Sequence, residues 1–229
     1  MVYARRMCSV LAWALFAAAG AGLLEDALDL ERSGDAERAL ASVEQLVRRD
    51  PTSPLARIEA ARLRLKLGKD LERAEMDLEA ARSLAPENPR VHYLWGLLME
   101  ERGRRADAIR ALELAVLYRP DYADARFQLA GDYFSEGNWA QAETHYRALS
   151  KLNSDSIQAR LQLAATLEKE GKLRQAEDEL RHLLVEQPRS ALFRRKLGEF
   201  YARTNRAALA AKMLDEPKRK MRELNKSSR

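Results

Sequence analysis

The chain has 229 residues, of which 33% are charged and 46% hydrophobic, and its formal net charge is +5. This balance is typical of amphipathic helices and argues against extended disorder. The charge excess lies at the two ends, because residues 1–21 carry +2 and residues 218–229 carry +5, which leaves −2 for residues 22–217. A near-neutral body lacks the basic surface that phosphate backbones require, so nucleic-acid binding is not expected.

The first 21 residues have the pattern of a secretory signal peptide. Arg5 and Arg6 precede an uncharged stretch at 7–24, which becomes rich in alanine and glycine towards its end. A positive start, an apolar centre and small residues predict export and cleavage after Ala21. The expected location is the periplasm or the exterior of a bacterium, the bacterial origin resting only on the alanine and arginine usage.

Two alternatives to cleavage remain at this stage. The 18 uncharged residues at 7–24 are just long enough to cross a bilayer as an uncleaved anchor, with the rest of the chain outside the cytoplasm. An intracellular protein is the other alternative. The single cysteine, Cys8, excludes an intramolecular disulfide and does not decide the compartment.

From residue 22 onwards the chain is built on a repeat of 34 or 35 residues. Glycines recur with this period at Gly34, Gly68, Gly103, Gly137 and Gly171. Each is followed five residues later, or six after Gly68 because of one extra residue near Lys69, by one alanine of the series Ala39, Ala74, Ala108, Ala142, Ala176 and Ala210, the last unit having Asn205 in place of glycine. Prolines close most units, at Pro51, Pro86, Pro120 and Pro188, with Ser154 at the fourth closure. Such a period predicts a stack of helical hairpins.

Each residue type has a physical role in such a hairpin. The glycine ends the first helix in a left-handed conformation, the alanine allows the paired helices to approach closely, and the proline stops the second helix. The first helices, called A helices, are expected at 23–33, 54–67, 89–102, 123–136, 157–170 and 190–204. The second helices, called B helices, are expected at 36–49, 71–85, 105–118, 139–152, 173–186 and 206–215.

The segments Leu94-Trp95-Gly96 and Leu197-Gly198-Glu199-Phe200-Tyr201 resemble the tetratricopeptide repeat, as does Ala108-Ile109-Arg110-Ala111-Leu112. The resemblance implies an all-α fold, a right-handed α-solenoid of about six antiparallel helix pairs spanning 22–217. The units are expected at about 20–53, 54–88, 89–122, 123–156, 157–190 and 191–217. Residues 218–229 follow as a basic tail, for which contact with anionic lipid or an acidic partner is one interpretation and a solvated end is the other.

In this family the A helices line a concave groove, which implies a candidate partner site here. The implied groove residues are Tyr93, Leu97, Phe127, Gln128, Phe134, Leu161, Gln162 and Arg195, with Gly131 and Ala165 between them. Aromatic and aliphatic side chains in a groove are suited to anchoring a partner helix or peptide. The alternative is that these rings pack between units as ordinary core. The carboxylate-clamp pattern of lysine, asparagine and arginine in this family is not reproduced.

Three arginines, Arg126, Arg160 and Arg194, recur at intervals of 34 residues in the A helices. Such a ladder is suited either to binding an acidic partner or to covering neighbouring helices while the guanidinium groups reach water or nearby glutamates. His92, His145 and His182 lie far apart in the repeat, so no metal site is expected. No catalytic constellation or cofactor motif is present, which predicts a non-enzymatic scaffold without cofactors.

Overall fold

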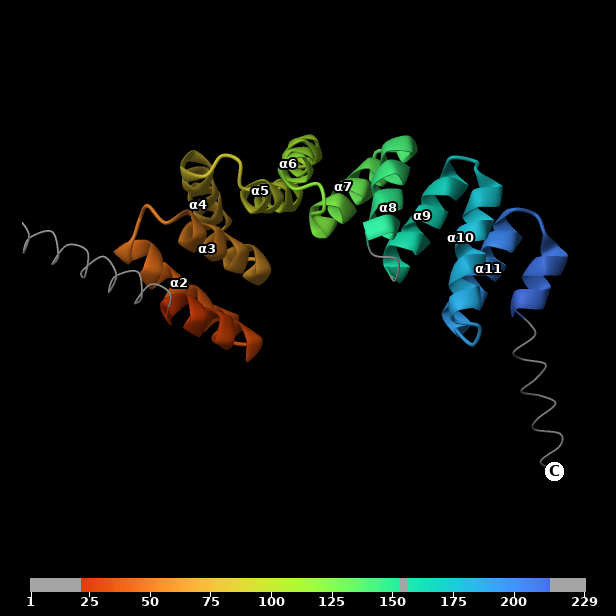
Figure 1. Ribbon diagram of the computed structural model, residues 1–229, viewed down its shortest axis with the longest axis horizontal. Coiled ribbons are helices and arrows are strands. Elements are labelled where there is room, and N and C mark those ends of the chain that lie inside the picture. The colour runs from red at the N-terminus through yellow and green to blue at the C-terminus, as the bar shows by residue number, and fades with distance from the viewer. Residues whose placement is uncertain (1–21, 153–155, 215–229) are drawn as a thin grey trace, which may run out of the picture. The chain divides into compact units, whose positions relative to one another are not determined.

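The computed structural model describes residues 22–152 and 156–214, and within them every regular element is a helix. Residues 22–32 form the first helix. It is followed by α2 (Ala36–Arg49), α3 (Pro54–Leu67), α4 (Leu71–Leu84), α5 (Pro89–Glu101), α6 (Arg105–Tyr118), α7 (Ala123–Ser135), α8 (Trp139–Leu152), α9 (Ile157–Lys169), α10 (Leu173–Glu186), α11 (Ala191–Arg203) and a last helix at 207–214. The protein is an all-α solenoid, as predicted (Figure 1).

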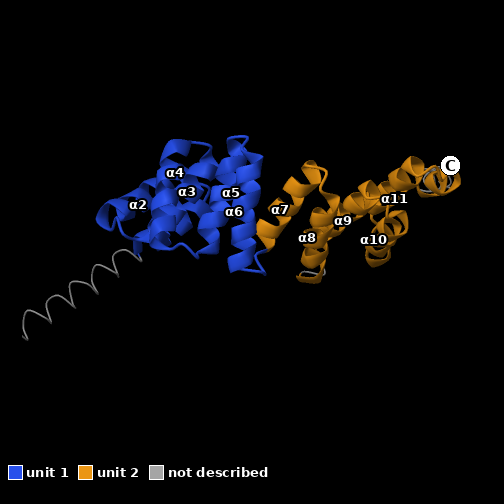
Figure 2. Cartoon of the chain, turned by 90° about the horizontal axis from the view of Figure 1, so that it is seen from above, with its two compact units in different colours: residues 1–122 blue, residues 123–229 orange. Residues whose placement is uncertain are grey.

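The chain divides into two compact units, 1–122 and 123–229 (Figure 2). In unit 1, α3 packs against α2, α4 and α5, and α5 packs against α6. In unit 2, α7 to α11 pack each against the next in the chain. Each unit therefore stacks antiparallel helix pairs on a core of its own.

The A helices begin where a side chain caps the first turn. Ser53, Ser156 and Ser190 accept a hydrogen bond from the backbone N–H three residues later, and Asn88 accepts one from Arg90. Pro54 and Pro89 follow two of these caps, at a helix position where the missing N–H costs nothing. The predicted starts of the A helices are confirmed to within one residue.

The A helices end at the repeating glycines, as the period predicts. Gly68 has φ +62° and the other four have φ between +70° and +91°, a region that glycine adopts without strain. Asn205, with φ +59°, takes this conformation in the last unit. The one extra residue of the second unit lies in the turn between Gly68 and the start of α4 at Leu71, where Asp70 has φ +49°.

Small residues at two fixed positions allow the paired helices to approach closely. The fourth residue of each B helix is the repeated alanine, which is fully buried in α2, α4, α6, α8 and α10. In α3, α5, α7, α9 and α11 the eighth residue is Ala61, Gly96, Ala130, Ala164 and Gly198, respectively. A Cβ added at Gly96 would lie 2.7 Å from Cγ of the buried Leu112, and one at Gly198 equally close to Leu214. A larger residue at either glycine therefore requires the neighbouring leucine side chain to shift.

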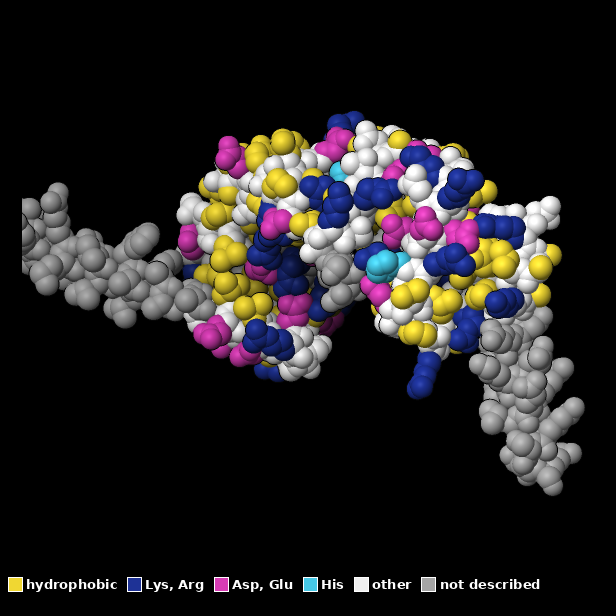
Figure 3. All heavy atoms as spheres, turned by 45° about the vertical axis from the view of Figure 1, so that its right-hand side comes forward, with side chains coloured by type: hydrophobic (Ala, Val, Ile, Leu, Met, Phe, Trp, Pro, Cys, Tyr) yellow, Lys and Arg dark blue, Asp and Glu magenta, His cyan; other side chains and the backbone are white. Residues whose placement is uncertain are grey.

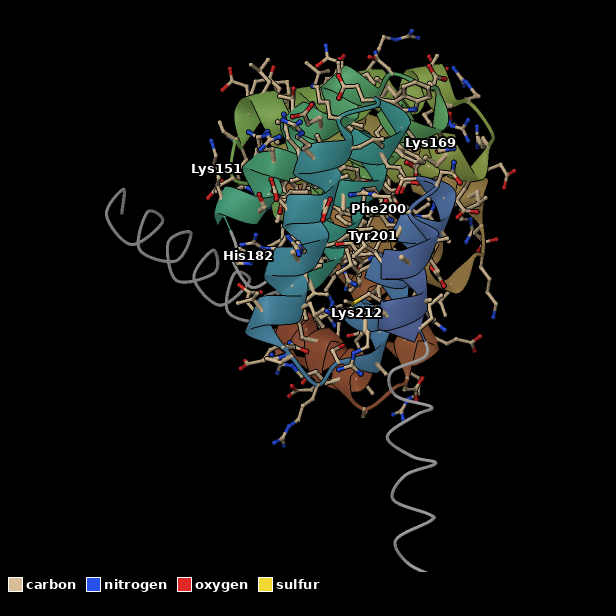
Figure 4. All side chains as sticks on the ribbon, turned by 90° about the vertical axis from the view of Figure 1, so that its right-hand side faces the viewer. Lys151, Lys169, His182, Phe200, Tyr201 and Lys212 are labelled. Atoms are coloured by element: carbon tan, nitrogen blue, oxygen red, sulfur yellow. The ribbon has the colours of Figure 1, made fainter. Side chains whose placement is uncertain are left out.

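The cores are built from aliphatic side chains of both helix types. In unit 1, Val43, Leu63, Leu78, Leu98 and Leu112 are buried. In unit 2, aliphatic residues are joined by a C-terminal aromatic cluster of Phe200 and Tyr201, whose rings lie 5.9 Å apart between the helices (Figure 4). Tyr201 donates a hydrogen bond to Glu177 at 2.8 Å, and the guanidinium of Arg206 lies over both rings while pairing with the same carboxylate.

Substitution of two glycines inside helices, Gly96 and Gly131, distinguishes the effect of helix propensity on stability from the effect of packing. Alanine favours a helix over glycine by about 1 kcal/mol at either site. At Gly96 the added methyl group would meet Leu112, whereas at Gly131 the nearest atom is the Tyr146 hydroxyl at 3.7 Å. We expect Gly96→Ala to lower the free energy of unfolding by about 1–2 kcal/mol, the cost of overpacking. Gly131→Ala should leave it unchanged or raise it by up to about 1 kcal/mol.

Urea unfolding followed by circular dichroism measures both variants. An equal change for Gly96→Ala and Gly131→Ala would show that the close approach at Gly96 does not constrain the core.

Candidate partner-binding surface

A concave site formed by A helices lies in unit 2, between α9 and α11. It encloses about 240 Å³. Its walls come from the A helices, with one residue of α10 in the floor; they are Gln158, Leu161, Gln162, Ala164, Ala165, Glu168, Leu180, Lys196 and Arg203. We call this site the A-helix pocket.

The chemistry of the A-helix pocket differs between floor and rim. Leu161, Ala165 and Leu180 supply an apolar floor, and Gln158 and Gln162 supply amides that both donate and accept hydrogen bonds. An apolar floor with a few polar groups around it is suited to an apolar side chain of a bound segment, with the amides fixing its backbone.

The charged side chains at the rim of the pocket differ in how closely they are paired. Glu168 receives two hydrogen bonds from Arg203, at 2.7 Å from Nε and 2.9 Å from Nη2, so this pair is a fork-to-carboxylate contact. Lys196 is half exposed and its closest carboxylate is Glu199 at 3.9 Å. The rim thus keeps one loosely held ammonium group that a carboxylate or a carbonyl of a partner can reach.

The structure places the predicted groove residues of unit 2 in two environments. Leu161 and Gln162 line the A-helix pocket. Phe127 and Phe134 are half buried and pack on the core of unit 2, with the Phe127 ring 5.6 Å from that of Tyr146 in an edge-to-face contact. The two rings therefore belong in part to the core. Gln128 is also half buried, on the same helix.

The remaining predicted residues lie outside the pocket. Arg195 is exposed and pairs with Glu199 in its own helix at 3.6 Å. Tyr93 and Leu97 belong to unit 1, where both are half buried against its core and the Tyr93 ring lies 5.0 Å from that of Tyr122. Their groove role stays a prediction.

Sequence reasoning missed several pocket residues, namely Gln158, Ala164, Glu168, Leu180, Lys196 and Arg203. One signal was available for two of them. Glu168 and Arg203 are 35 residues apart, and so are Glu31 and Lys66, which form the same kind of pair at the same positions of unit 1. An acidic residue followed one repeat later by a basic one is therefore a recognisable contact between successive A helices.

In unit 1, the A helices carry a network of ion pairs. Arg62 binds Glu31 through both terminal nitrogens, at 2.8 and 2.5 Å, and Glu59 through Nε at 2.7 Å. Arg90 also pairs with Glu59, which is only 5% exposed. The hydrogen bonds from Arg62, aided by Lys66 and opposed by partial burial, lower the pKa of Glu31 to about 2.

The arginine ladder is used within the protein. Each ladder arginine is the fourth residue of its A helix. Two of them contact the seventh residue of the following B helix: Arg126 donates to His145 and Arg160 to Glu179, both at 3.4 Å. Arg194 donates to the carbonyl of Pro188 at 2.9 Å, and Arg57 makes the equivalent bonds to Asp77 and to Pro51. Among the two interpretations, the structure favours contacts with neighbouring helices over a site for an acidic partner.

Other predicted features can be placed only in part. No group of three or more potential metal ligands occurs in the part of the chain that the structure describes.

Of the helices at 22–152 and 156–214, none combines the length and apolarity needed to cross a membrane. The predicted leader at 1–21, Ser154 and the basic tail lie outside the described residues. On the face shown in Figure 3, basic and acidic side chains are intermixed rather than segregated.

Comparison with known proteins agrees with this architecture. Family models described as tetratricopeptide repeat match residues 24–89, 93–157 and 133–195. No curated protein matches the sequence. Among solved structures, the chain is similar to a tetratricopeptide repeat protein from Parabacteroides merdae, with 22% identity and a TM-score of 0.67 over 86% of this chain and 78% of that one.

Two further structures are similar at the level of the fold. PilW, described as a type IV pilus biogenesis factor, has 20% identity and a TM-score of 0.70 over 85% of this chain and 90% of its own. YrrB, described as a TPR protein with an unusual peptide-binding site, has 21% identity and a TM-score of 0.59 over 75% and 88%. At these identities the likeness concerns the fold alone.

The Glu31 network makes a prediction about acid. A carboxylate whose pKa is about 2 in the folded state and near 4.5 when unfolded stabilises the fold above pH 4.5, and this contribution is lost as the pH falls towards 2. Between pH 4.5 and pH 2 the wild type should lose about 1–3 kcal/mol more of its free energy of unfolding than Glu31→Gln does, because the variant has no carboxylate to protonate at this position.

Chemical denaturation at several pH values gives this comparison. Glu25→Gln, which removes an exposed carboxylate from the same helix, is the control and should follow the wild type. Parallel pH profiles for Glu31→Gln and the wild type would contradict the assigned role of Glu31.

Proposed function

Because the chain belongs to the tetratricopeptide repeat family, we propose that it is a non-catalytic scaffold that holds a helix or extended segment of a partner protein in the A-helix pocket. Proteins of this family are generally interaction scaffolds that bind protein or peptide partners. The observation that carries the proposal is the pocket itself, with its apolar floor of Leu161, Ala165 and Leu180 beside two glutamine amides.

Part of the pocket lining is already held in place by the fold. Leu180 and Ala164 are buried, and Glu168 is fixed by Arg203 across the gap between α9 and α11. A rigid receptor loses little entropy on binding, so more of the contact energy appears as affinity. YrrB offers a precedent within the fold for peptide binding.

We also propose that the scaffold acts in the bacterial cell envelope, during assembly or secretion. The proposal is supported by the charge and hydropathy pattern of residues 1–24 and by the fold-level similarity to PilW, a pilus biogenesis factor. A membrane-anchored adaptor and an intracellular adaptor are the other outcomes of the test below.

Site-specific photo-cross-linking tests the pocket. A benzophenone amino acid at the exposed position Gln158 should give a discrete adduct with a partner in the native host, because Gln158 lies at the pocket rim. The same probe at Val185, which is 77% exposed on α10 and away from the pocket lining, should give none. Ala165→Trp should reduce the Gln158 adduct by at least tenfold, because an indole ring attached at Ala165 would occupy the space that a partner side chain needs.

Val185→Trp is the matched control, since it adds the same ring to an exposed position of unit 2. Adduct formation that survives Ala165→Trp in a folded protein, or that occurs equally from Val185, would contradict binding in the A-helix pocket.

The mass of the protein purified from its host tests the proposed location. Export with cleavage predicts a mature chain that begins at Gly22 and is released with the periplasmic fraction. An intact chain in the membrane fraction would indicate the anchored form, and an intact chain in the cytosol would overturn export.

A further inference from the structure

A second cavity lies in unit 1, on the side formed by B helices α2 and α4 with α3 as its floor. It encloses about 250 Å³. The residues that matter for its chemistry are Val47, Arg48, Arg57, Arg64, Arg73 and Met76. We call it the arginine groove. It shares no residue with the A-helix pocket.

Arg64 is the unusual residue of this groove. It is the eleventh residue of its A helix, and the same position in the later A helices is occupied by Met99, Tyr133, Leu167 and Tyr201. Arg64 is only 4% exposed, although burial of a charge costs several kcal/mol. The eleventh position of the A helix, which holds an apolar or aromatic residue in the later repeats, therefore holds an arginine in α3.

The buried charges of the groove balance one another. Arg64 pairs with Asp77 and, at 2.7 Å, with Glu44, while Arg57 pairs with Asp77 at 2.9 Å. Two arginines and two carboxylates therefore form the floor. The Nε atom of Arg64 is nevertheless buried with no hydrogen-bond partner among the described residues.

The exposed rim carries the surplus charge. Arg48 comes from α2 and Arg73 from α4, and both are exposed. The nearest carboxylate of Arg48 is the already shared Glu44, at 3.7 Å. The groove has a net charge of +2, counting four arginines against Glu44 and Asp77, whereas residues 22–217 together carry −2. The net charge of the groove is therefore opposite in sign to the net charge of residues 22–217 as a whole.

The rim also has an apolar component. Val47 and Met76 line the groove together with the arginines, and Met76 is 66% exposed. A thioether on a flexible side chain adapts to irregular apolar groups. A lining that combines arginine side chains with aliphatic and thioether groups matches a peptide that carries carboxylates next to an aliphatic side chain, which a bare phosphate does not.

We propose that the arginine groove binds an acidic-apolar peptide segment of a partner protein, its carboxylates on Arg48 and Arg73 and its aliphatic side chain on Val47 and Met76. This surface is separate from the A-helix pocket, so the scaffold has two docking sites on different helices. One chain can then hold two segments at once, which raises the effective concentration of each for the other.

Fluorescence anisotropy with defined peptides tests the proposal on the full chain. The probe is a fluorescein-labelled peptide of alternating glutamate and leucine, and its matched control alternates glutamine and leucine. We expect the glutamate peptide to bind at least tenfold more tightly, with an affinity that falls as salt is raised. Arg48→Gln combined with Arg73→Gln should weaken it at least tenfold. Both residues are exposed, so circular dichroism should show an unchanged fold.

Arg49→Gln is the control variant, because Arg49 is an exposed arginine next to Arg48 that does not line the groove. It should bind the glutamate peptide like the wild type. Equal loss in Arg49→Gln, equal binding of the two peptides, or no binding by the wild type would overturn the proposal. Stronger displacement of the probe by inorganic phosphate than by unlabelled glutamate peptide would also overturn it, in favour of a phosphate site.

Discussion

The constraint on which the rest of the structure depends is the close approach of the two helices in each pair. It requires alanine as the fourth residue of the B helix and alanine or glycine as the eighth residue of the A helix, and these alanines are almost fully buried. At Gly96 and Gly198 the neighbouring leucine side chain occupies the space that a Cβ would need. Once these positions fix the axis of a pair, every other position of the 34-residue repeat acquires a defined environment.

The same register explains how one repeat carries several surfaces. The fourth residue of an A helix reaches its own B helix or the closing proline, as Arg160 and Arg194 show. The eleventh residue faces the core in most repeats and becomes Arg64 in the arginine groove. The position of Leu161 faces the A-helix pocket. Differences between repeats at one position therefore change the chemistry of one surface and leave the fold intact.

Most of the fold could be predicted from the sequence, because it is encoded by local signals. The glycine period gave the helix ends, and Asn205 in the left-handed conformation confirms the altered last unit. Local signals are present at the starts as well, since Ser53 and Ser156 cap α3 and α9 and Pro54 follows Ser53. The predicted ends were one residue too long in most A helices, since Arg102 and Glu170 cap the helix instead of continuing it.

The candidate sites were less predictable, because they depend on side chains brought together from different repeats. The sequence predicts Phe127 as a groove residue, whereas in the structure its ring packs against the ring of Tyr146 at the core. Whether a ring at that position is covered depends on the size of residues on α8, which the period does not reveal. Arg64 was overlooked for a similar reason. Its significance appears only when its burial and its partners Asp77 and Glu44 are known.

The central claim is that α9 and α11 hold a partner segment between them. A crystal structure of the full chain with the partner identified by cross-linking tests it most directly. The account predicts a partner side chain on Leu161 and Ala165, with its backbone within hydrogen-bond distance of Gln158 or Gln162. A partner seated on other helices, with the A-helix pocket open to solvent, would contradict it.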